Sequence, residues 1–254
     1  MPMADGERVN DTGVTVAMLG PLEVRRDGVS IHLANGRVRT LLAVLAMSAG
    51  DTVPMQRLAL ALWGEDLPVN VRRSVQTLVT RLRRALGSQV VRSLPEGYRL
   101  DIDPDRVDVL RFQRMLNEAA RAQDAAQERL LLGEALALWR GSPYESIDSD
   151  LLRTAESAYL VEAYLSAVER RIDLDLSEGC HHELVPELKR LTELHPLRES
   201  LWARLLVALG RCRRPAEGLA SYERLRRLLA DELGTEPSVE LRRLHSLLLR
   251  PQTM

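Results

Sequence analysis

The hydrophobic pattern of the first hundred residues changes from a period of two to a helical period and back. Residues 14–28 are β-branched and apolar and end at Asp27-Gly28, a dipeptide typical of hairpin turns, and residues 29–33 alternate apolar with polar positions. Helical periodicity follows over 39–50, 53–64 and 70–87, and two strands are predicted in 90–102 around Pro95-Glu96-Gly97. Strands, three helices and a hairpin in this order predict a winged helix-turn-helix with an additional N-terminal sheet.

The rest of the chain has only helical patterns, so the predicted fold is mainly α. Residues 1–13 are polar and predict a flexible tail, 14–103 the winged-helix domain, and 104–250 an all-helical domain that starts after the polar segment 103–108. Asp124 with Gln127 fits a capping box, and Gly179, Gly210 and Gly234 fit helix C-termini. Residues 164–195 and 198–231 form two loose copies of a tetratricopeptide-like hairpin. The predicted helices are 109–122, 125–139, 150–178, 181–194, 198–209, 215–232 and 238–249.

Residues 70–87, NVRRSVQTLVTRLRRALG, form a strongly two-sided helix. At about 100° per residue, one face of this helix is aliphatic. The opposite face carries Arg73, Gln76, Thr77, Thr80, Arg81 and Arg84, with Arg72 and Arg83 on one flank. No acidic residue lies in the stretch, although a solvated helix normally mixes both signs of charge.

Charge along the chain singles out the same region. The whole sequence has a formal net charge of −1, but residues 37–92 contain nine arginines against Asp51, Glu65 and Asp66. The third helix of a helix-turn-helix enters the major groove, where Arg reads guanine and binds phosphate and Gln or Thr reads A·T pairs. We therefore expect DNA binding, with Gln76, Thr77, Thr80 and Arg81 toward bases and the remaining cations toward phosphates. These are Arg72, Arg73 and Arg84, together with Arg92 and Arg99 beside the wing.

Other chemistry has little support in the sequence. Cys180, His181, His182 and Cys212 lack the spacing of a zinc site, and no hydrolase, dinucleotide or P-loop motif is present. We expect no enzyme activity, no cofactor and no metal. Two alternatives stay open: a helical-repeat module that binds protein, and a ligand sensor without direct DNA readout. With no apolar run of membrane-spanning length and two cysteines, a cytoplasmic, nucleoid-associated protein is expected.

Several segments resemble the Streptomyces antibiotic regulatory protein family, over about residues 14–249. They are MLGPLEVRRDGVSIHL, the helix pair that ends in ALWG, VQTLVTRLRRALG, PEGYRLDI, EALALWRG and the long block from ELHPLRES to VELRRLH. The resemblance implies an OmpR-type DNA-binding domain followed by a bacterial transcriptional activator domain. It also implies activation of biosynthetic gene clusters through recruitment of RNA polymerase to promoters with direct repeats, where a second copy binds beside the first.

The loop before the basic helix gains a role from this resemblance. In the OmpR-type fold, this loop contacts RNA polymerase. Glu65 and Asp66 lie there in an otherwise basic domain and could meet a basic surface of the sigma factor. The alternative is that both are ordinary solubilising acids at the end of a helix.

Overall fold

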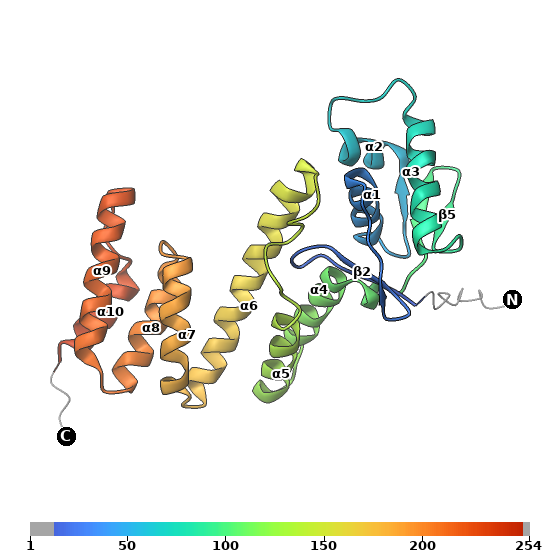
Figure 1. The fold of residues 1–254 in the computed structure, drawn as a ribbon. Helices are drawn as coiled ribbons and strands as arrows, with labels where there is room; N and C mark the ends of the chain where they lie inside the picture. The colour runs from blue at the N-terminus through green and yellow to red at the C-terminus, as the bar shows by residue number, and fades with distance from the viewer. Residues whose placement is uncertain (1–12, 251–254) are drawn as a thin grey trace, which may run out of the picture. The chain divides into compact units, whose positions relative to one another are not determined.

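A computed structural model describes residues 13–250, so residues 1–12 of the expected tail lie outside the described range. The fold class is confirmed, with a small winged region followed by helices (Figure 1). The chain divides into two compact units, Met1–Leu165 and Ser166–Met254. The domain boundary expected at residue 103 stays a prediction. The two units reflect how the chain packs, and they do not show where the winged-helix domain ends and the activator domain begins.

The N-terminal sheet has three antiparallel strands, β1 (Val14–Ala17), β2 (Glu23–Arg26) and β3 (Val29–Ser30), in that order. The predicted turn at Asp27-Gly28 is confirmed: both residues have positive φ, at 50° and 81°. The sequence pattern missed the first turn and read 14–28 as one strand. The chain reverses around Gly20, whose φ is 144° and whose absent side chain would meet the backbone of Gly141.

The winged region follows the predicted order with one addition. Helices α1 (Gly36–Ala46), α2 (Met55–Trp63) and α3 (Val71–Leu86) precede the hairpin of β5 (Val91–Ser93) and β6 (Gly97–Leu100). A further strand, β4 (Thr52–Pro54), pairs with β6, so that helix 53–64 starts two residues later than predicted. Gly97 is required there, because a Cβ on it would lie 1.9 Å from the carbonyl oxygen of Val53.

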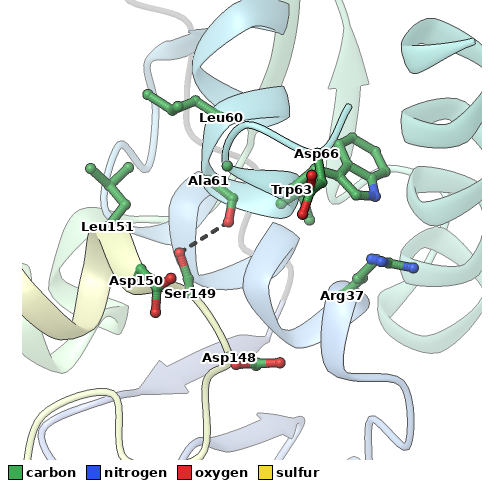
Figure 2. A pocket seen from close by; sticks show the side chains of 11 residues that line it. Arg37, Leu60, Ala61, Trp63, Asp66, Asp148, Ser149, Asp150 and Leu151 are labelled. Atoms are coloured by element: carbon green, nitrogen blue, oxygen red, sulfur yellow. Dashed lines mark hydrogen bonds between the residues drawn. The ribbon is translucent and has the colours of Figure 1, made fainter. Parts of the chain in front are cut away.

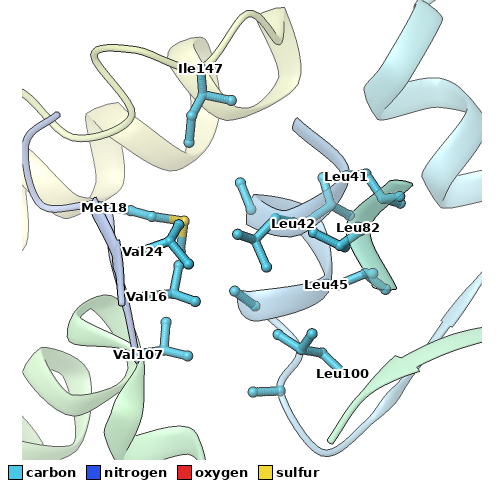
Figure 3. Packing of buried hydrophobic residues seen from close by; sticks show 14 of the residues in the cluster. Val16, Met18, Val24, Leu41, Leu42, Leu45, Leu82, Leu100, Val107 and Ile147 are labelled. Atoms are coloured by element: carbon cyan, nitrogen blue, oxygen red, sulfur yellow. The ribbon is translucent and has the colours of Figure 1, made fainter. Parts of the chain in front are cut away.

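The first helices of the expected activator domain share the core of the winged region. A 3₁₀ turn (Pro104–Arg106) leads into α4 (Asp108–Ala119), and α5 (Ala125–Leu136) follows. A π-helical turn (Leu152–Glu156) then leads into α6 (Ser157–Ser177). Figure 3 shows Val107 and Ile147 in one cluster with Met18, which directly follows β1, and with Leu45 of α1. The Asp108 carboxylate accepts the backbone N–H groups of Met18 and Leu19 at 2.7–2.9 Å, which ties α4 to the end of β1.

The second unit consists of helical hairpins. Its helices are α7 (His181–Leu194), α8 (Glu199–Arg211), α9 (Pro215–Leu233) and α10 (Val239–Leu248); α7 packs on α8, α8 on α9, and α10 on both α8 and α9.

The expected cap at Asp124 is confirmed, since its carboxylate accepts Gln127 N–H at 2.7 Å. The prediction for Gly210 was wrong. It lies inside α8, where the absence of a side chain admits Leu248 of α10.

Candidate nucleic-acid interface

Helix α3 has the two-sided structure that its sequence predicts. Asn70 caps it, with its side-chain oxygen accepting the N–H of Arg73 at 2.9 Å, and Gly87 ends it with a φ of 107°. The aliphatic face is buried in the core of the first unit through Val75, Leu78, Val79, Leu82 and Leu86. The seven residues of α3 that were predicted to meet DNA are all exposed: Arg72, Arg73, Gln76, Thr77, Thr80, Arg81 and Arg84.

The first turn of α3 is electrostatically unfavourable in isolation. It contains Arg72 and Arg73 and no acidic residue, next to the positive end of the helix dipole. A cation at that position costs about 0.3–1 kcal/mol, whereas an anion there is stabilised. A bound phosphate would offset both arginines and the dipole. Their arrangement therefore fits an anionic partner better than it fits the stability of the free helix.

Thr77 and Thr80 have their hydroxyl hydrogens occupied by the helix. Thr77 Oγ1 donates to the carbonyl of Arg73 at 3.0 Å, and Thr80 Oγ1 donates to that of Gln76 at 2.9 Å. Each hydroxyl oxygen can still accept a hydrogen bond, and each side chain retains a methyl group. The pair is suited to the amino groups of adenine or cytosine and to the methyl group of thymine.

Arg83 has a structural role that the sequence did not reveal. Its Nε and Nη2 donate to the carbonyl of Val91 at 2.9 and 2.7 Å, and Nη2 also donates to Ser93 Oγ at 2.9 Å. Both acceptors belong to β5, so this side chain joins the basic helix to the wing. Its position on the flank of the helix was visible in the sequence, but its partners on the strand were not.

The two wing arginines share one acidic partner. Arg92 and Arg99 are cross-strand neighbours on β5 and β6, and both pair with the buried Asp101, Arg99 at 2.7 Å. One carboxylate offsets one of the two charges, and the side chain of Arg92 is still 48% exposed. The contact of these arginines with DNA stays a prediction. Tyr98 is 6% exposed, so its side chain packs within the wing.

The loop between α2 and α3 presents apolar as well as acidic side chains. Glu65 and Asp66 are exposed, as expected for a contact loop. Leu67 and Val69 in the same loop are 55% and 109% exposed. The loop therefore exposes two apolar side chains next to the two acids. Leu67 and Val69 were not among the predicted site residues, although apolar residues on either side of Pro68 were a signal.

Two family models match the chain. Residues 107–249 match the family model "Bacterial transcriptional activator domain", and residues 30–100 match "Transcriptional regulatory protein, C terminal". The regulatory protein DnrI of Streptomyces peucetius is 36% identical over 249 residues, with 92% of each chain covered. The chain belongs to the Streptomyces antibiotic regulatory protein family. This family consists of DNA-binding transcriptional activators of antibiotic gene clusters, and the chain is such an activator.

Other members of the family and its relatives are longer. The regulatory protein AfsR of Streptomyces coelicolor is 37% identical over 253 residues, which are 98% of this chain and 25% of AfsR. A solved structure, Mycobacterium tuberculosis EmbR in complex with a low-affinity phosphopeptide, has 31% identity and a TM-score of 0.85. That match covers 95% of this chain and 66% of the EmbR chain. The chain thus spans about a quarter of AfsR and about two thirds of EmbR.

Residues 13–250, which the structure describes, contain no candidate site for a metal ion. Within this range, no three His, Cys, Asp or Glu side chains are arranged so that they could hold a metal ion. Cys180 and Cys212 are free thiols at the start of α7 and the end of α8. None of the helices in the same range has both the length and the apolar character that crossing a membrane requires.

Proposed function

We propose that the exposed face of α3 enters the major groove of promoter DNA and reads it with Gln76, Thr77, Thr80 and Arg81. The observation that carries this proposal is that all seven predicted DNA-contacting residues of α3 are exposed on a carboxylate-free face, while the other side of the helix is buried. Arg72, Arg73 and Arg84 bind phosphates, and Arg92 and Arg99 of the wing contact the backbone beside the groove. Because phosphate contacts dominate affinity, binding weakens steeply as salt rises.

Two copies bind side by side on direct repeats in this proposal. Repeats spaced by one helical turn, roughly 10–11 bp, would place both copies on the same face of the duplex. Family membership supports this arrangement. The regulated genes are a secondary-metabolite cluster, and the protein acts at the nucleoid.

Recruitment of RNA polymerase is the second part of the proposal. The exposed acids Glu65 and Asp66 and the apolar pair Leu67 and Val69 form the contact loop, which meets a basic surface of the sigma factor. The charge of this loop is opposite to that of α3, so the loop would be repelled by DNA. One region of the unit thus suits a polyanion and another suits a basic protein.

Genome-wide chromatin immunoprecipitation in the native host identifies the operator, and a titration on that fragment tests the readout. If Arg81 contacts a base, Arg81→Ala should lose about 1–3 kcal/mol of binding energy on the operator. Arg84→Ala should weaken operator and random DNA alike and reduce the log–log salt slope by about 0.9. Equal operator affinity of Arg81→Ala and wild type would contradict the assignment of Arg81.

A further inference from the structure

A hollow of about 450 Å³ opens beside the end of α2. It lies within the first unit, between the last turn of α2, the start of the contact loop and residues 148–151, which precede α6 (Figure 2). Five of the residues that line this hollow form a surface that we call the Asp–Leu surface. They are Leu60, Asp66, Asp148, Asp150 and Leu151.

Hydrogen bonds to two helices hold segment 148–151 in place. Ser149 is 5% exposed, and its Oγ donates to the carbonyl of Ala61 in α2 at 3.0 Å (Figure 2). Thr40 of α1 is 1% exposed, and its Oγ1 donates to the backbone carbonyl of Asp148 at 3.1 Å. Ser149 is buried, whereas the side chains of the aspartates on either side of it are exposed. Asp148 and Asp150 are thereby presented from a fixed backbone.

The Asp–Leu surface is acidic. The side chains of Asp148 and Asp150 are 86% and 96% exposed, and Asp66 is exposed beside them. Arg153 pairs with both segment aspartates, at 3.5 and 3.0 Å. The last turn of α2 contains no basic residue, so the partial negative charge at the C-terminal end of this helix adds to that of the aspartates. Three carboxylates against the two cations Arg37 and Arg153 leave a formal charge of −1 here, which favours a cationic partner over a polyanion.

The surface also offers an apolar anchor point. Leu60 is 54% exposed although it lies in the last turns of α2, and Leu151 is half-buried on the same side of the hollow (Figure 2). Trp63 contributes to the lining, with the guanidinium of Arg37 6.0 Å from its ring centroid. An exposed leucine at a hollow rimmed by carboxylates fits one apolar side chain flanked by cations.

We propose that the Asp–Leu surface binds a segment of the RNA polymerase holoenzyme that carries Arg or Lys on both sides of an apolar residue. It extends the contact of Glu65 and Asp66 into a surface made from two distant parts of the chain. This inference rests on the proposed function, because it assumes that polymerase is recruited. A second copy of the chain fits less well, since its α3 arginines are committed to DNA in that function.

The test is the double variant D148N/D150N, which removes two charges from exposed positions and leaves the backbone hydrogen bonds in place. Single-round transcription with purified polymerase holoenzyme and the operator-bearing promoter should give at least fivefold less activated transcript than wild type. Promoter affinity measured without polymerase should stay within twofold of wild type. Leu60→Ser should lower activation in the same way, because it removes the apolar anchor. The matched control D231N/E232Q removes two exposed charges from α9 and should activate like wild type.

The outcomes distinguish a failure of the proposed function from a failure of the proposal for the Asp–Leu surface. If wild type neither binds promoter DNA nor activates transcription, the proposed function fails. If wild type does both and D148N/D150N activates equally well, the proposal for the Asp–Leu surface is wrong and the function stands. If D148N/D150N instead loses cooperative binding of a second copy without polymerase present, the surface is an interface between copies, and the proposal is likewise overturned.

Discussion

Arg81 and Arg83 are two residues apart on one helix, yet the structure predicts opposite consequences for their removal. Arg81 is exposed, whereas Arg83 makes three hydrogen bonds to β5. A hydrogen bond contributes about 0.5–1.5 kcal/mol net, and solvent replaces part of this at a half-exposed site, so we expect Arg83→Ala to lower the free energy of unfolding by about 1–3 kcal/mol. Loss of a cation from the last turn of α3 adds about 0.3–1 kcal/mol. Arg81→Ala should change stability by less than about 0.5 kcal/mol.

Arg83→Lys separates the charge from the hydrogen bonds. Lysine keeps the favourable charge at the end of the helix but cannot reach Val91 and Ser93 with a planar fork. We therefore expect stability to fall in the order wild type, Arg83→Lys, Arg83→Ala. Urea denaturation followed by circular dichroism gives the free energies, and hydrogen exchange of the β5 and β6 amides localises the effect to the wing.

DNA titration of the same variants completes the comparison. Arg81→Ala should lose operator affinity without losing stability. Arg83→Ala should lose wing protection in hydrogen exchange, with a smaller loss of affinity that comes from the loosened wing. If Arg83→Ala were as stable as wild type and lost as much affinity as Arg81→Ala, the wing-joining role assigned to Arg83 would be refuted.

Three further predictions concern packing, pH and chain length. Gly133→Ala has open space and should stabilise the protein by about 0.5–1 kcal/mol, whereas Gly218→Ala should give a smaller gain or none, because its Cβ would lie 2.8 Å from a terminal methyl of Leu248, which must shift; thermal denaturation measures both. Hydrogen bonds from Arg214 and then Lys189 lower the pKa of Glu217 from 4.5 to about 2, so its contribution to stability is present above pH 4.5 and is lost as the pH falls through about 2. Glu217→Gln should therefore show a smaller fall in Tm across that range, and an unchanged fall would contradict this. A fragment of residues 1–103 should unfold at a lower temperature than a fragment of residues 1–178, because it lacks the core contacts of Val107, Phe112 and Ile147. Thermal unfolding of the two fragments, followed by circular dichroism, tests this.

Most of the helices were predicted correctly from local sequence patterns. The amphipathic pattern of 70–87 identified the buried and exposed faces of α3 because its period is set within the helix itself. The predicted helices 181–194 and 215–232 match α7 and α9 within one residue, since glycine and proline near their ends are local signals. Residues 52–54 were read partly as helix because a three-residue strand becomes visible only when its partner β6 is known.

The contacts that organise the candidate sites could not be predicted in this way. Arg83 and Arg84 are adjacent in the sequence and equally charged, but only Arg83 meets β5, and that depends on how the wing packs. Asp148 joins Asp66 at one hollow because Thr40 and Ser149 hold its segment against α1 and α2. No periodicity within residues 145–151 encodes that placement. Pairing across the fold, rather than local preference, decides these positions.

The shared core has a consequence for how the first unit could work. The buried faces of α2 and α3, the N-terminal sheet, and the residues Val107 and Ile147 belong to one hydrophobic cluster. Close-packed protein interiors have low compressibility and transmit displacement. The exposed face of α3 and the aspartates at 148 and 150 are therefore fixed relative to each other before any partner binds. In the proposed function, seating α3 in the groove would orient the Asp–Leu surface directly, without an ordering cost in this unit when polymerase arrives.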